Sequence, residues 1–336
     1  SYLRVDSSAT SLTGWASRIW LDKVSGNWIF NAAIGAIHPN FETNDVGFLS
    51  RADVINSHIY LGYEWYEPEG MFRTKAIDGA IVREFDFGGK RTGESYQLFL
   101  SSQFLNYWRA SLSLAYYGET YDDQRTRGGP LMKSLSSRSM ALNLSSDSRK
   151  SLYGSLNASA GRGESGGWLY TTGLYINWKA SRTLNASVNV DFSRVHNASQ
   201  FIAAVADVYA ATTYGTRYVF GVLDQKQLST ALRLNWTFTP KLSFQLFLQP
   251  LLSTGSFPGI MELAQPGTFT FNRYGEGKSQ ISFADGQYTI YPNGPAGQAP
   301  GFRIGTPDFN FKSLRANAVF RWEYLPGSTL YFVWTN

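Results

Sequence analysis

The amino-acid sequence predicts an all-β fold, an antiparallel transmembrane β-barrel. The first observation is composition: aromatic residues make up 16% of the 336 residues and charged residues only 16%, whereas a soluble domain carries about 25% charge. The second is alternation of apolar and polar residues in segments of about ten residues, the length of a tilted membrane strand. The third is that the apolar face of these segments repeatedly ends in Trp, Tyr or Phe, as in the interfacial girdles of membrane barrels.

Composition also excludes several other classes of protein. Mean hydropathy is −0.23 and no run approaches roughly 18 consecutive apolar residues, so a helical membrane bundle is excluded. The aromatic content argues against disorder. The sequence has no Cys, which excludes disulfides, thiolate metal sites and a Cys nucleophile. The net charge of +5 is dispersed, without the basic cluster expected of a protein that binds nucleic acid.

Residues 228–238 show the alternation most clearly, with Leu232 and Leu234 on one face and Arg233 and Asn235 on the other. A soluble antiparallel sandwich alternates in the same way, but the second face here would make a poor core and suits a wet lumen. The residues expected to face lipid are Leu232, Leu234, Val188, Val190, Ala318 and Phe320. Those expected to face the interior are Arg233, Asn189, Asn317 and Arg321.

Taken in order, the alternating segments and the turn residues between them predict about sixteen strands. They span residues 11–21, 26–36, 54–66, 70–86, 93–104, 107–119, 136–146, 150–161, 167–178, 183–193, 198–207, 214–223, 227–238, 241–252, 311–324 and 328–335. Segment 70–86 is the weakest, because its alternation breaks near Ala76–Asp78 and indicates a bulge. Residues 224–226 are expected to form a short outer loop.

The connections between these strands alternate between short turns and longer links, as periplasmic turns and extracellular loops do in membrane barrels. The whole chain, residues 1–336, is predicted to be a single barrel domain, with residues 253–310 as a long, ordered outer loop. Since bacterial barrels begin and end on the periplasmic side, strand parity predicts that a strand is missing at each end. The chain is therefore expected to be an exported fragment, without its signal peptide, of a barrel with about eighteen or more strands.

Three stretches resemble a known family: residues 310–335, 235–245 and 44–53. They are similar to the outer-membrane β-barrel domain that commonly follows a family-nine carbohydrate-binding module in Gram-negative bacteria. The resemblance implies an outer-membrane location, a glycan-binding module before the barrel and a final strand after Val333–Thr335. It implies no catalytic residues, because that family has none established.

The residues that usually carry catalysis or bind metals form no constellation in the sequence. His38, His58 and His196 are each without a nearby nucleophile or carboxylate motif, and no Gly-x-Ser-x-Gly elbow is present. Oxygen-rich stretches at residues 40–48 and at Asp122-Asp123 offer calcium ligands, but they also fit turn-rich outer loops. No enzyme activity, cofactor or metal is predicted.

The expected lumen-lining residues are charged side chains on the polar faces of strands, where rings of charge set solute selectivity. They are Lys179, Asp191, Arg233, Arg315, Arg321 and Glu323. The alternative is that Arg321 and Glu323 pair with neighbouring strands. The loop 253–310 is too long for a passive link, and it is expected to narrow the lumen, cap the mouth or form a docking surface.

The sequence thus predicts an outer-membrane barrel of a Gram-negative bacterium that passes or captures a solute, with an oligosaccharide as the expected class. The alternative is a structural or assembly barrel with a closed lumen, whose outer loops bind a partner protein. An enzyme embedded in the barrel ranks third. The lipid bilayer is an expected partner in every case, and nucleic acid is not.

Overall fold

The computed structural model describes residues 11, 13–43, 47–49 and 51–336. It is 68% strand and 1% helix, with antiparallel sheets, which confirms the all-β, antiparallel prediction. The helical element is a single 3-10 turn, η1 (Ala211–Thr213). Within the described residues, no helix has the length and apolar character needed to cross a membrane. The predicted strand 11–21 begins at Ala16, and part of the 40–48 stretch lies outside the described residues.

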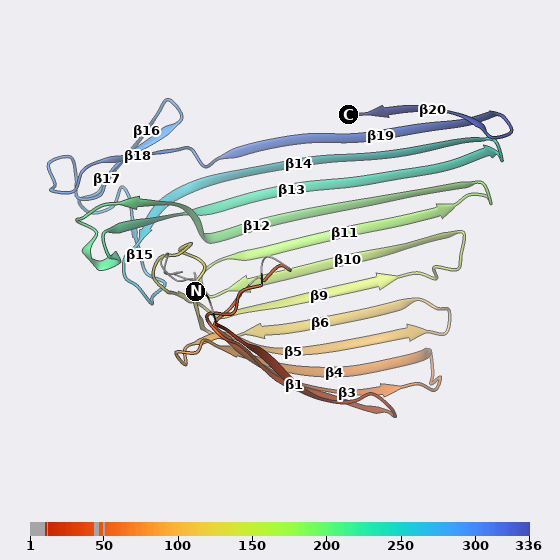
Figure 1. Cartoon of the computed structure of the whole chain (residues 1–336), viewed down its shortest axis with the longest axis horizontal. Coiled ribbons are helices and arrows are strands. Elements are labelled where there is room, and N and C mark those ends of the chain that lie inside the picture. Colours follow the sequence, from red (N-terminus) through yellow and green to blue (C-terminus); the bar gives the residue numbers. More distant parts are fainter. Residues whose placement is uncertain (1–10, 12, 44–46, 50) are drawn as a thin grey trace.

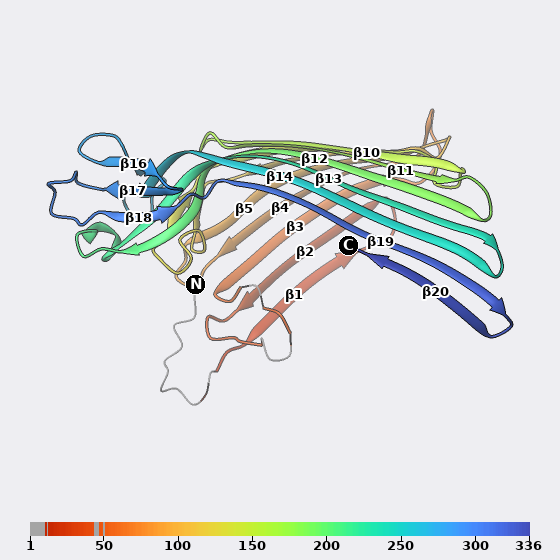
Figure 2. The ribbon, with the colours of Figure 1, turned by 90° about the horizontal axis from the view of Figure 1, so that it is seen from above.

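The main sheet contains 15 strands, which lie side by side largely in chain order (Figure 1). They are β1 (Ala16–Lys23), β2 (Trp28–Ile37), β3 (Val54–Trp65), β4 (Phe72–Phe85), β5 (Arg91–Phe104), β6 (Arg109–Tyr117), β9 (Ser137–Ser145), β10 (Leu152–Gly163), β11 (Trp168–Lys179), β12 (Leu184–Ala206), β13 (Thr216–Thr239), β14 (Leu242–Leu263), β19 (Phe309–Leu325), β20 (Ser328–Thr335) and β15 (Phe271–Arg273), which pairs with the end of β14. Figure 2 shows that the sheet is twisted and curled, as right-handed strand twist requires, with β1 and β20 at its free edges.

The register keeps apolar and polar residues on separate faces of the sheet. Val188 pairs with Leu232, Leu232 with Leu248, and Leu248 with Ala316, and directly paired residues share a face. In the same way Ser187 pairs with Arg233. All six residues predicted to face lipid lie on one face, which we call the apolar face, and the four predicted to face the interior lie on the other, the polar face.

Two predicted strand breaks are wrong, because β12, β13 and β14 are continuous strands of 23, 24 and 22 residues. The segment 224–226 is not a loop: within β13, Asp224 pairs with His196 and Lys226 with Arg194. The apparent breaks coincide with register shifts, between Asn197 and Gln200 in β12 and near Asp224 in β13. A β-bulge adds one residue and reverses the phase of the alternation, so one bent strand resembles two strands in the sequence.

The bulge predicted at Ala76–Asp78 is also wrong. These residues of β4 pair without interruption with Leu100 and its neighbours in β5, and the register shifts lie near the two ends of β4. The pattern weakens here for another reason: Gly79 occupies the apolar face and supplies no side chain to mark it. The alternation of apolar and polar residues is therefore weaker here, although the pairing of β4 with β5 is unchanged.

The connections separate into two ends of the sheet, visible in Figure 1. Tight turns join the strands at one end, at residues 24–27, 66–71, 105–108, 146–151, 180–183, 240–241 and 326–327. The connections at the other end are 38–53, 86–90, 118–136, 164–167, 207–215 and 264–308. We refer to these as the turn end and the loop end. The predicted alternation of connections is confirmed outside residues 194–226; there the strands run on, and the segment 207–215, predicted on the side of the short turns, lies at the loop end.

At the loop end, β12–β14 run beyond their neighbours into a packed unit that we call the head, formed by residues 118–136, 197–224 and 255–308. The predicted loop 253–310 contributes its first part to β14, and the rest is ordered. The additional strands of the head are β7 (Thr120–Asp122), β8 (Met132–Ser134), β16 (Gln280–Ala284), β17 (Gln287–Tyr291) and β18 (Phe302–Gly305). Residues 118–136 and 264–308 are joined by backbone hydrogen bonds, including Gly267 N–H to Leu131 O at 2.7 Å.

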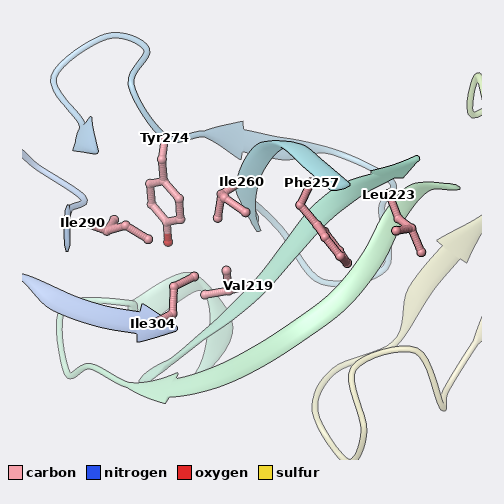
Figure 3. Close-up of a cluster of buried hydrophobic side chains, with 7 residues drawn as sticks. All are labelled: Val219, Leu223, Phe257, Ile260, Tyr274, Ile290 and Ile304. Carbon is pink, nitrogen blue, oxygen red and sulfur yellow. The ribbon is translucent and has the colours of Figure 1, made fainter. Parts of the chain in front are cut away.

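The hydrophobic core of the molecule lies in the head, on both faces of β13. On one face, Val219 and Leu223 pack with residues of β14, β17 and β18 (Figure 3). On the other, Phe220 packs with Met132 from the loop 118–136. Val219 and Phe220 are adjacent in sequence and both fully buried, which a strand achieves only with layers on both sides. Gly221 fits this crowding, because a Cβ there would lie 2.7 Å from Phe257 Cδ1.

Candidate functional site

Polar and charged side chains that can bind a solute or take part in chemistry gather on the polar face of the sheet. At its β1–β3 side, the amide of Asn31 joins two strands, donating from Nδ2 to Asp22 Oδ1 and contacting His58 Nε2 through Oδ1. Across β10 and β11, the hydroxyls of Ser159 and Thr171 lie 2.6 Å apart. At these two places, side chains of neighbouring strands on this face hydrogen-bond to one another.

Asp78 of β4 is the most enclosed carboxylate of this face, at 8% exposure. It sits opposite Gly62 of β3, and a Cβ at Gly62 would clash with its Oδ1. Glycine at this position therefore lets the carboxylate lie against the neighbouring backbone. Among the described side-chain atoms, Asp78 Oδ1 is buried without a hydrogen-bond partner. Buried polar atoms in this state often mark a place where water or a ligand binds.

A hollow of about 540 Å³ opens on the polar face beside Asp78. Its walls combine carboxylates, a guanidinium, amides and hydroxyls, from Glu64, Asp78, Gln103, Arg109, Ser111 and Asn143 among others. Such a surface offers both donors and acceptors of hydrogen bonds. None of these residues was predicted as a site residue. The alternation of β6 places Arg109 on the polar face, whereas that of β4 breaks at Asp78, so the sequence contained only part of the signal.

The six predicted lumen-lining residues all lie on the polar face, but they do not form one cluster. Lys179 Nζ lies 3.5 Å from Ser148 O and 5.2 Å from the centre of the Tyr153 ring. Asp191 accepts a hydrogen bond from Asn189 Nδ2. These contacts hold the charged groups of Lys179 and Asp191 against the polar face at separate positions.

The three arginines among the six differ in their surroundings. The guanidinium of Arg233 lies 4.9 Å from the ring centre of Phe247. Arg321 Nη2 lies 3.4 Å from Glu323 Oε2, so this pair forms along β19, where the alternative reading expected pairing with neighbouring strands. Arg315 is exposed and faces Gln249. Whether any of the six contacts a solute stays a prediction.

A buried ionic cluster, which sequence reasoning missed, holds the head together. Arg217 Nε lies 2.6 Å from Asp207 Oδ2, and its Nη1 lies 2.7 Å from Glu262 Oε2. The Tyr274 hydroxyl donates to the same Glu262 oxygen at 2.9 Å. Burial, followed by the charge of Glu262, raises the pKa of Tyr274 above its usual range, so this phenol remains a donor. The three charged residues are each at most 9% exposed, which indicates a structural role.

The head also has a polar hollow of about 630 Å³ beside this cluster. Its lining includes Arg273, Glu276, Asn293 and Gln298. These charged and amide groups can both donate and accept hydrogen bonds.

The other candidates from the sequence, His38, His196 and Asp122, make contacts that are typical of structural residues. His38 packs against Trp15 and Phe87, and His196 Nδ1 lies 2.7 Å from Asp224 Oδ1. Of the oxygen-rich stretches, Asn44 and Asp45 lie outside the described residues. Asp122 accepts the backbone N–H groups of Gln124 and Arg125. No group of three or more metal-ligating side chains occurs within the described part of the chain.

At the turn end, Arg149 pairs with Asp147 of its own turn, 146–151, and also contacts the neighbouring turn. Arg149 donates through Nε and Nη2 to the two oxygens of Asp147, both at 2.8 Å. Its guanidinium also lies 3.2 Å from the ring centre of Tyr107, in the turn 105–108. Hydrogen bonding from Arg149 lowers the pKa of Asp147 to about 2.

Because the pKa of Asp147 is lower in the folded protein than its ordinary value of 3.8, its ionised form stabilises the fold above about pH 4. This contribution is lost as the pH falls towards 2. We expect the Asp147→Asn variant to melt at a lower temperature than the parent in detergent at pH 7, with the difference vanishing near pH 2. Melting curves recorded across this range check the prediction. A difference that stays constant with pH would contradict the role assigned to the ionised carboxylate.

Comparisons with known proteins identify one relationship. A family model described as a domain of unknown function (DUF5916) matches residues 1–336. Neither the curated proteins nor the solved structures include a significant match to the chain.

Proposed function

The chain belongs to the DUF5916 family, and we propose that its main sheet forms the wall of a transmembrane β-barrel in the outer membrane of a Gram-negative bacterium. We propose that this barrel passes or captures a solute. The observation that carries this proposal is the separation of an apolar and a polar face across the whole sheet. A soluble sheet with this pattern would bury its apolar face. Here that face exposes large side chains, such as Ile19 at 74% and Phe332 at 59%, which in water would favour association.

The depth of the apolar band supports a membrane location. On β11 it runs from Tyr170 to Trp178, and on β13 from Leu228 to Trp236. Both spans measure about 26 Å along the strand at roughly 3.3 Å per residue, and a tilt of 35–45° reduces this to about 20 Å. The apolar band of outer-membrane barrels is about 25 Å tall with aromatic girdles at its borders. Trp178 and Trp236 occupy that border at the turn end.

The free edges of the sheet fit the same proposal. β1 is exposed at all eight of its residues, and the described strands form an open series from β1 to β20. In lipid each unpaired backbone group costs several kcal/mol. We therefore propose that both edges pair with further strands in the membrane, which closes the barrel and turns the polar face into its lumen.

An oligosaccharide is the solute class that this polar face suits best. Amides, hydroxyls and tyrosines occur on it beside the charged groups, among them Asn31, Asn143, Ser159, Thr171 and Tyr153. Sugars bind through many neutral hydrogen bonds and through contacts with aromatic rings. The resemblance to a barrel domain that follows a carbohydrate-binding module points to the same class.

Single-channel recording tests the proposal. The full-length protein, reconstituted in planar bilayers, is expected to show discrete conductance steps. The double variant Arg233→Gln, Arg315→Gln removes two cations from the polar face and should shift the reversal potential in a KCl gradient towards cation selectivity. The double variant Lys226→Gln, Lys312→Gln is the matched control, because it removes two cations from the apolar face and should cause no shift.

A second candidate function is a structural or assembly barrel with a closed lumen that binds a partner protein through its outer loops. The tip of the head favours it, since Val208 is 83% exposed, Tyr214 80% and Tyr209 50%. Exposed aromatic side chains on an ordered loop are typical of contact surfaces. Correct insertion without any conductance would favour this candidate over solute passage.

A further inference from the structure

A row of cations borders the apolar band on the loop-end side, and we call it the basic rim. Its members lie on six different strands: Arg83, Arg138, Arg162, Arg194, Lys226 and Lys312. The register places them on the apolar face. Arg138 pairs with Tyr116 and Arg194 with Tyr170, and Lys226 precedes Leu228 by two residues. If the sheet lies in a membrane as proposed above, the basic rim points outward at headgroup level and away from the lumen.

The basic rim is poorly neutralised by the protein itself. Arg138 lies directly opposite Arg162, and Arg194 directly opposite Lys226. Like charges in directly opposite positions destabilise a sheet. Arg83 pairs with Glu94 at 3.3 Å, while the other five members form no ion pair within the described structure. Two acids of the same face are already paired, Glu94 with Arg83 and Arg91, and Asp224 with His196. The basic rim therefore carries cations that can bind an anion from outside the protein.

A groove of about 560 Å³ lies on the apolar face beside the Arg138–Arg162 pair. Leu98, Leu114 and Met140 supply an apolar floor, and the small side chain of Ala160 leaves it open. The two arginines close the groove at its loop end, together with tyrosines. The groove is thus an open depression of the apolar face with a cationic end and an apolar floor.

We propose that this groove binds a phosphorylated membrane lipid, with the phosphate between Arg138 and Arg162 and an acyl chain along Leu98, Leu114 and Met140. Guanidinium groups bind phosphate through paired charge-assisted hydrogen bonds. A phosphate here relieves the repulsion between the two arginines, which a neutral headgroup does not. A free anion gains nothing from the apolar floor, and a nucleic acid would have to desolvate it.

The test measures binding of lipid A, a phosphorylated acylated sugar, to the full-length protein in detergent. The variant is the double substitution Arg138→Gln, Arg162→Gln. The matched control is Arg182→Gln, Lys241→Gln, which removes two exposed cations from turns at the opposite end. We expect the affinity for lipid A to fall at least about tenfold in the first variant and to stay unchanged in the control. Dephosphorylated lipid A should bind the parent protein as weakly as lipid A binds the first variant.

Three outcomes would overturn the proposal: equal binding of lipid A by the parent and the Arg138, Arg162 variant, equal binding of dephosphorylated lipid A, or competition by inorganic phosphate at equimolar concentration. The proposal rests on the membrane location proposed above, so insertion into vesicles is measured in parallel by protease protection. Failure to insert would overturn both proposals. Insertion without selection for the phosphorylated lipid would overturn this one alone.

Discussion

Replacing Arg217 with Met is expected to destabilise the head by about 3–5 kcal/mol, because it leaves two buried carboxylates without their shared cation. Asp207 and Glu262 lie within 2.7 Å of this guanidinium and are at most 9% exposed. The measurement is the free energy of unfolding from urea titration in detergent. Proteolysis near the tip 207–215 reports on the head alone.

The control for this prediction removes all the charges together. The triple variant Arg217→Met, Asp207→Asn, Glu262→Gln contains no unpaired buried charge and should regain most of the lost stability. If the single and triple variants are equally unstable, the loss comes from packing around the arginine stem, and the ionic account is wrong.

The substitution Leu232→Arg is expected to have the largest effect within the apolar band of the sheet. Leu232 lies near the centre of the apolar band on β13, between Val188 and Leu248. A charged side chain at the bilayer midplane costs about 2–4 kcal/mol in an outer-membrane barrel. A folding titration in lipid vesicles measures this cost.

The matched control places the same residue on the other face of the same strand. Ser229 lies on the polar face, directly opposite Asp191, so Ser229→Arg introduces a cation beside a carboxylate. We expect this variant to fold almost as well as the parent. Equal destabilisation by the two substitutions would show that the apolar face is not in contact with lipid.

The sequence predicted the β class, the division of side chains between two faces and the alternation of connections, because each depends on local, period-two patterning. It failed where tertiary packing changes that pattern. In β12 and β13, register shifts near Asn197 and Asp224 reverse the phase. Beyond them, Val219 and Phe220 are both buried, so alternation no longer marks a strand.

The candidate site was predictable as a face but not as a set of contacts. Alternation placed Arg233 and Asp191 correctly on the polar face. The alternation contained no information about which residues of neighbouring strands lie opposite one another. The cluster of Arg217, Asp207 and Glu262 joins residues 45 positions apart, through a pairing that only the bent strands create. The hollow beside Asp78 likewise depends on Gly62, a residue that periodicity does not mark.

The uninterrupted course of β12, β13 and β14 has a mechanical consequence. These strands carry backbone pairing from the turns at 180–183 and 240–241 directly into the head, so no flexible joint separates the two. A lid that swings open needs a hinge of a few loop residues that absorb large backbone rotations. We therefore expect the head to keep a fixed position relative to the sheet, at the loop end of β12–β14. Any regulated movement at the loop end must therefore come from connections outside the head, such as 86–90 between β4 and β5.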